Sequence, residues 1–251
     1  MPEFKEPVIY LYDGSFSGFL CCVYESVYSG KMPSDIYSYS SDQITLFEKL
    51  IIATDEYKAR RVLQSIPDRI SHDAQKLIET VFLSCLKQKE YLMLNFLRRG
   101  YREGSRILSK LGDPGVSCLL NAKRSLLKEA HLFTGFVRFA DYNGSLAATI
   151  TPKNFVLPFI AKHFILRYKD NDFIIFDNTH KAALLYQNRH PDIISVDNID
   201  FPPISDEESK YRSLWKRFYD TLAIEARENP RCRMTHMPKR YWVNMPEMHD
   251  Q

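Results

Sequence analysis

The chain has 251 residues, of which 45% are hydrophobic and 13% aromatic, so it can fill a substantial core. It has no apolar run of roughly 18 residues or more and no N-terminal signal segment, which argues against a membrane span and secretion. Its net charge is only +3, and its five irregularly spaced cysteines suit a reducing compartment and form no metal motif. We therefore expect a cytoplasmic protein without metal or cofactor.

The N-terminal part is predicted to alternate strands and helices. Residues 8–14 are β-branched and aromatic, which favours a strand, and residues 15–30 have hydrophobic positions at helical spacing. A second strand is predicted over residues 48–54, followed by a helix to about residue 66 that Asp55 can cap. The chain is thus expected to begin β-α-β-α.

Three further helices are predicted over residues 71–87, 90–111 and 114–133. The third begins clearly, because Asp113 is a good cap and Pro114 occupies a position where its missing N–H costs nothing. These helices carry much of the positive charge of the chain.

The central region changes to the alternating pattern of strands. Asn143-Gly144 lies between two alternating runs and predicts a hairpin, and a second hairpin is predicted to turn at residues 178–180. A short helix over residues 156–168 separates them. The predicted fold class is α+β: a helix-rich protein with a small, mostly antiparallel sheet.

The C-terminal part begins with a predicted stiff, exposed connection over residues 188–204. A capping box at residues 205–208 then opens a helix. Its apolar stripe is predicted to join the core, and it consists of Tyr211, Leu214, Trp215, Phe218, Leu222 and Ala226. We expect a single domain over residues 1–251, with possible sub-parts 1–134, 135–204 and 205–251.

Positive charge is concentrated in two blocks. Residues 87–128 contain ten basic and three acidic residues, and residues 210–242 contain nine basic and three acidic residues. The rest of the chain is therefore acidic. Such blocks favour a polyanionic ligand if they share one face, and solvated helix faces are the alternative.

The second block also contains adjacent aromatic residues near its end. Cations suit a phosphate backbone and flat rings suit unstacked bases, although rings packed on the core with cations left in water are an equally good interpretation of this segment. The residues predicted to bind nucleic acid are Arg98, Arg99, Arg102, Arg231, Arg233, Lys239, Arg240, Tyr241 and Trp242.

Motifs of several enzyme classes are absent, including the P-loop, G-x-G-x-x-G, H-E-x-x-H, G-x-S-x-G and zinc deaminase signatures. The remaining catalytic candidates are His131, His163 and Asp177 for acid–base chemistry, with Arg138 to hold a phosphate. For His163 a partly buried, hydrogen-bonded histidine is the favoured alternative. For Asp177 it is the start of a turn.

Four segments in register resemble a bacterial family of probable DNA metabolism proteins. The similarity covers almost the whole chain, and the segments are VIYLYDGSFSGFL, EAHLFTGFVRFAD, PKNFVLPFIAKHFILRYKDNDFIIFDNTHKAALLY and MPKRYW. The resemblance implies a DNA-repair context and a partner, a putative DNA modification or repair radical SAM protein. In some members the domain is fused to a uracil-DNA glycosylase-like domain. Neither activity transfers to this chain, because the cluster cysteines and glycosylase-type motifs are missing.

Three functions follow from these observations. The first is a DNA-binding accessory protein whose radical SAM partner performs the reaction. The second is a nucleic-acid-processing enzyme that uses the four catalytic candidates. The third is a protein adaptor whose basic faces meet an acidic partner without direct DNA contact.

Overall fold

The computed structural model describes residues 8–39, 47–142, 144–199, 201, 203, 205–222 and 230–248. The chain divides into two compact units, unit 1 (residues 1–126) and unit 2 (residues 127–251), each with a hydrophobic core of its own. The division falls within one long helix, α5 (Pro114–Phe136). The single domain over residues 1–251 stays a prediction, whereas the α+β fold class is confirmed.

Unit 1 contains a three-stranded parallel sheet in the order β2-β1-β3. β1 (Val8–Tyr12) is central, and β2 (Asp35–Ser38) and β3 (Glu48–Ile51) pair with it. The sequence predicted β1 and β3 but missed β2, which is short and has a single buried hydrophobic side chain, Ile36. Pairing with β1, rather than a local pattern, makes this segment a strand. The predicted β-α-β-α order is confirmed with one strand added.

Local capping sets where the first helices of unit 1 begin. Ser15, Asp55 and Ser71 each accept a hydrogen bond from a backbone N–H of the first helical turn. The helix predicted over residues 90–111 is divided at Gly104, whose φ of +65° is incompatible with a continuous α-helix. The helices before α5 are α1 (Phe16–Tyr28), α2 (Glu56–Arg69), α3 (His72–Phe82), α4 (Lys89–Glu103) and the 3-10 helix η1 (Gly104–Ser109).

Unit 2 contains a five-stranded sheet in the order β4-β5-β6-β7-β8. Its neighbours are antiparallel except β5 and β6, which are parallel because α6 (Leu157–Arg167) connects them. Both predicted hairpins, β4–β5 and β6–β7, are confirmed. The exposed strand β8 lies within the segment predicted as a connection, and its pairing with β7 decides its conformation. The strands are β4 (Ala140–Tyr142), β5 (Ser145–Ile150), β6 (Phe173–Asp177), β7 (Ala182–Gln187) and β8 (His190–Ser195).

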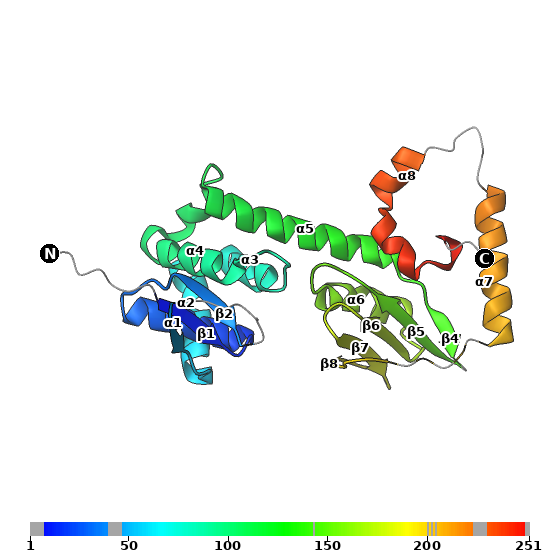
Figure 1. The fold of residues 1–251 in the computed structure, drawn as a ribbon, viewed down its shortest axis with the longest axis horizontal. Helices are drawn as coiled ribbons and strands as arrows, with labels where there is room; N and C mark the ends of the chain where they lie inside the picture. The colour runs from blue at the N-terminus through cyan, green and yellow to red at the C-terminus, as the bar shows by residue number, and fades with distance from the viewer. Residues whose placement is uncertain are drawn as a thin grey trace. The chain divides into compact units, whose positions relative to one another are not determined.

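The core of unit 2 joins the sheet to α5, α6 and the C-terminal segment (Figure 1). Ile175 of the sheet, Phe133 of α5 and Ile160 of α6 are buried in it. Tyr241 and Met245 of the C-terminal segment are buried in the same cluster. This segment therefore belongs to unit 2, and its elements are α8 (Pro230–His236), η3 (Lys239–Asn244) and η4 (Pro246–Met248).

The apolar stripe of α7 (Asp206–Leu222) is exposed, which corrects the prediction that it joins the core. Tyr211 is 68% exposed, and Leu214, Trp215 and Phe218 are exposed as well. The side chain of Leu222 and residue 226 lie outside the described part of the chain. Helix α7 contacts η4. The periodicity of the α7 sequence identifies an apolar face, but periodicity does not determine whether another part of the protein covers that face.

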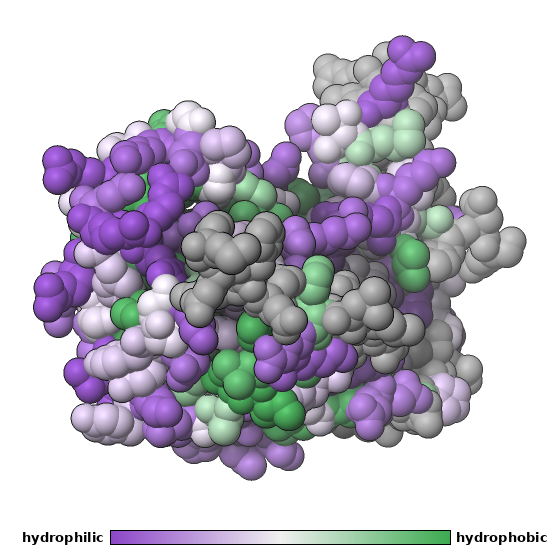
Figure 2. All heavy atoms as spheres, turned by 60° about the vertical axis from the view of Figure 1, so that its left-hand side comes forward, coloured by the Kyte–Doolittle hydropathy of each residue, from purple (hydrophilic) through white to green (hydrophobic). Residues whose placement is uncertain are grey.

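Hydrophilic residues predominate on the face shown in Figure 2, and hydrophobic residues form smaller groups between them. Scattered apolar side chains are normal on the surface of a folded domain. Among the helices that the structure describes, none is long and apolar enough to cross a membrane.

Truncating Ile175 to Ala should destabilise the protein by about 2–5 kcal/mol, because this fully buried side chain on the central strand β6 would leave a cavity. Ile194→Ala on the edge strand β8 is the matched control, since this side chain is 37% exposed. Urea unfolding followed by circular dichroism measures both changes. Equal losses of stability would contradict the positions of these two strands in the sheet.

Candidate functional site

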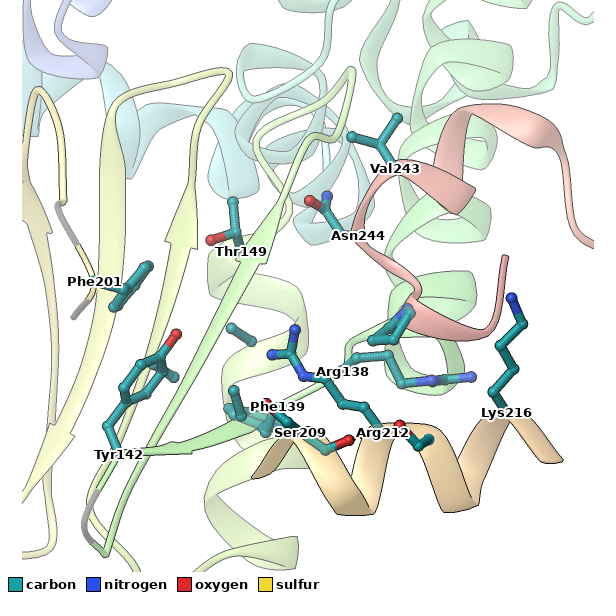
Figure 3. A pocket seen from close by; sticks show the side chains of 15 residues that line it. Arg138, Phe139, Tyr142, Thr149, Phe201, Ser209, Arg212, Lys216, Val243 and Asn244 are labelled. Carbon is teal, nitrogen blue, oxygen red and sulfur yellow. Dashed lines mark hydrogen bonds between the residues drawn. The ribbon is translucent and has the colours of Figure 1, made fainter. Parts of the chain in front are cut away.

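A pocket of about 500 Å³ lies within unit 2, where β4, β5, α7 and η3 each contribute to its wall. Its lining includes three cations, Arg138, Arg212 and Lys216, and three aromatic rings, of which Tyr142 and Phe201 form a stacked pair and Phe139 is the third. Figure 3 shows the two stacked rings together on one side of the view and the cations on the other. The pocket thus offers a positively charged region and a flat apolar region to one ligand.

Arg138 is held in place by a buried carboxylate. Its Nε and Nη2 donate to Glu247 Oε1 at 3.0 and 2.7 Å, and Nη1 donates to the Gly135 carbonyl at 2.8 Å. The Glu247 side chain is only 2% exposed, so this partner is fixed by its surroundings. The ring of Trp215 lies 5.9 Å from the guanidinium. These contacts fix the orientation of the Arg138 fork at the pocket.

The other two cations come from one side of α7. Arg212 Nε donates to Glu208 Oε1 at 2.8 Å, and Glu208 Oε2 accepts from the Asp141 backbone N–H at 3.3 Å. No other contact of the Arg212 guanidinium is found within the described ranges, so its two Nη groups remain available as donors. Lys216 follows one helical turn later and lines the same pocket. Glu247 and Glu208 are the carboxylate partners of the two arginines.

The aromatic part of the pocket is a stacked pair. The ring centroids of Tyr142 and Phe201 are 5.6 Å apart, and their planes differ by 21°. This is an offset-stacked arrangement, to which a further flat ring can be added. Of the residues described, the pocket is lined by no His, Asp or Glu. The ring pair and the cations together suit a ligand that has both a flat ring and a negative charge.

Residues 87–247 match the model of DUF4130, a family described as a domain of unknown function. The chain belongs to the DUF4130 family. The match covers well over half of the chain and includes all six pocket residues named above. A search of curated proteins finds no match for the chain.

The adjacent aromatic residues near the end of the DUF4130 region pack onto unit 2. Tyr241 is 4% exposed, and its ring contacts those of Phe133 and Phe136 at centroid distances of 5.1 and 5.0 Å. Burial raises the pKa of the Tyr241 hydroxyl. Trp242 is half-buried, and its Nε1 donates to the Met237 carbonyl at 3.0 Å. In this conformation Tyr241 presents no face for stacking on a base.

Arg240 pairs with the buried carboxylate Glu129. Its Nη1 lies 3.0 Å from Glu129 Oε1, and its Nη2 donates to the Tyr241 hydroxyl. Glu129 also accepts the backbone N–H groups of Lys153 and Asn154 at 3.0 and 2.9 Å. The carboxylate therefore joins α5, the segment after β5 and η3, and Arg240 contributes to holding unit 2 together.

Two of the three predicted cations of unit 1 have partners outside their own helix α4, whereas Arg102 Nε donates to the Arg98 carbonyl within it. Arg98 Nη1 donates to the carbonyls of Ser26 and Lys31 at 2.9 and 2.7 Å. Arg99 Nη1 lies 2.7 Å from Asp113 Oδ2. A backbone N–H of α5 and this guanidinium lower the pKa of Asp113. Arg102 is exposed.

The remaining predicted nucleic-acid ligands lie in unit 2. Arg231 and Lys239 are exposed, and Lys239 Nζ is 5.9 Å from the Trp242 ring centroid. The side chain of Arg233 lies outside the described part of the chain. A nucleic-acid role for this predicted set stays a prediction.

The four catalytic candidates have different neighbours. His131 and His163 are exposed on α5 and α6, so His163 is not the partly buried residue that its sequence neighbours indicated. Asp177 is fully buried and begins a turn, as predicted: its Oδ1 accepts the Thr179 and His180 backbone N–H groups, and its Oδ2 lies 2.7 Å from His180 Nδ1. Of the four, Arg138 is the one that lines the pocket.

Sequence reasoning did not single out four further pocket residues, which are Arg212, Lys216, Tyr142 and Phe201. Arg212 and Lys216 belong to the second basic block, and their spacing of four on a predicted helix was a usable signal. Tyr142 and Phe201 gave no such signal, because they are far apart in the sequence and only the fold stacks them.

Replacing Arg240 by Gln should destabilise unit 2 by about 1–3 kcal/mol, because buried Glu129 would lose its charged partner. Lys239→Gln is the matched control, since it removes the same charge from an adjacent exposed residue. Thermal unfolding of both variants measures the difference. Equal stability of the two variants would show that the ion pair with Glu129 is not structural.

Proposed function

We propose that this DUF4130 protein is a DNA-binding accessory protein in DNA repair or modification. The observation that carries the proposal is the pocket of unit 2, where three cations and a stacked ring pair face one space. Phosphate groups and unstacked bases require this combination of positive charge and flat apolar surface.

The repair context comes from the resemblance of the chain to the probable DNA metabolism proteins. That resemblance supports a complex with a radical SAM protein. The partner would supply the iron–sulfur chemistry, since this chain lacks the cysteine spacing for the cluster. The composition of the pocket supports a binding role beside such an enzyme, because its described lining has no acid–base pair. Catalysis through His131, His163 and Asp177 has no comparable support.

A protein adaptor is the second candidate, and the exposed face of α7 favours it. Tyr211, Leu214 and Phe218 form an apolar stripe, which is typical of a surface that contacts another protein. Co-purification with the radical SAM protein before and after nuclease treatment separates the candidates. Nuclease-resistant association without DNA affinity of the isolated chain would favour the adaptor.

Lys216→Gln should weaken binding to single-stranded DNA and lower the salt dependence of the affinity, because one phosphate contact would be lost. The slope of log affinity against log salt should fall by about 0.7. Fluorescence anisotropy of a labelled oligonucleotide at several salt concentrations measures both quantities.

Arg217→Gln is the matched control for this test. It removes the same charge from the next residue of α7, which is exposed and does not line the pocket. Affinity and slope should stay close to those of the unaltered protein. Undetectable DNA binding, or equal effects of the two substitutions, would refute the proposal that this pocket binds DNA.

A further inference from the structure

We infer that the pocket holds one unstacked nucleotide, with its base against the Tyr142–Phe201 pair and its phosphate among Arg138, Arg212 and Lys216. The inference rests on the proposed function and specifies the part of DNA that this site recognises. It follows from the separation of the two kinds of side chain, with rings on one side of the view and cations on the other (Figure 3).

The size of the pocket limits what can enter it. A volume of about 500 Å³ lies within the range of sites for single small ligands. Bases in a duplex are stacked on their neighbours, so their faces are not accessible to Tyr142 or Phe201. A base that reaches this ring pair must therefore come from a single strand, or be turned out of a duplex.

The ring pair provides the base site. Tyr142 and Phe201 are already stacked, with their planes 21° apart, so little ordering of these side chains is needed when a base adds to the stack. Stacking on aromatic side chains depends little on sequence, because every base has a flat face. The pocket should therefore accept all four bases with modest preferences.

The cations provide the phosphate site. Arg138 is oriented in advance by Glu247, and Arg212 keeps both Nη groups available within the described ranges. Lys216 adds a third positive charge one turn further along α7. The guanidinium groups of Arg138 and Arg212 and the ammonium group of Lys216 can together bind the oxygens of one phosphate.

Calorimetric titration of the full chain with thymidine 5′-monophosphate, deoxyribose 5-phosphate and thymidine tests this inference. The nucleotide should bind at least about fivefold more tightly than the sugar phosphate, because stacking of one base on aromatic side chains raises the binding affinity roughly 5- to 150-fold. Lys216→Gln should lower the affinities for the nucleotide and for the sugar phosphate by similar factors. Phe201→Ala should lower the affinity for the nucleotide and leave the affinity for the sugar phosphate unchanged.

Tyr211→Ala is the control for the loss of a ring, since this exposed tyrosine of α7 lies outside the pocket. It should leave nucleotide affinity unchanged. Tyr142→Leu is a second test of the ring pair if Phe201→Ala lowers the melting temperature. Equal affinities for nucleotide and sugar phosphate, or a nucleotide affinity that neither Phe201→Ala nor Tyr142→Leu lowers, would overturn the inference.

Failure of this inference is distinguishable from failure of the proposed function. If oligonucleotide binding keeps its dependence on Lys216 while the base contributes nothing, the pocket is a backbone phosphate site and the proposed function stands. If oligonucleotides fail to bind, both are refuted.

Discussion

The ion pair between the buried carboxylate of Glu247 and the half-buried Arg138 is the interaction on which the architecture of the pocket depends. Glu247 belongs to η4, near the end of the described chain, whereas Arg138 lies two residues before the start of β4. The pair therefore joins the C-terminal segment to the sheet and at the same time fixes a cation of the pocket. A buried carboxylate needs such a partner, because an uncompensated charge in the interior is costly. Stability of unit 2 and the shape of the site are thus coupled.

The Glu129–Arg240 pair repeats this arrangement at a second place. Glu129 of α5 accepts two backbone N–H groups of the segment after β5 as well as the guanidinium of η3. Arg240 lies in the second basic block and Arg138 lies outside both blocks, yet each has a buried carboxylate as its partner. In unit 2, Arg138 and Arg240 therefore each stabilise the fold by pairing with a buried carboxylate.

Helix α7 has two faces with different properties. Arg212 and Lys216 line the pocket, while Tyr211, Leu214 and Phe218 are exposed. A helix that combines a cationic side with an uncovered apolar side can contact a nucleic acid and a protein at the same time. This combination supports the proposed role of an accessory protein beside a partner enzyme.

The amino-acid sequence by itself determined the local structure of this protein. Most helices and both hairpins could be predicted, because caps, the Asn143-Gly144 turn signal and helical periodicity depend on residues close together in the chain. The division of the predicted helix at Gly104 and the helix α8 were not predicted. Of the pocket residues discussed, the sequence analysis named only Arg138 as a candidate. An arginine can bind a phosphate or carboxylate wherever it is accessible, so its residue type was a sufficient signal.

Tertiary structure alone decided the remaining features, because each depends on partners that are distant in sequence. β2 and β8 become strands by pairing with β1 and β7. Arg98, Arg99 and Arg240 were predicted as DNA ligands, and their structural partners became visible only in the fold. Tyr142 and Phe201 form a ring pair because folding stacks them. Charge and periodicity describe a residue's own chemistry, whereas its partner is set by long-range packing.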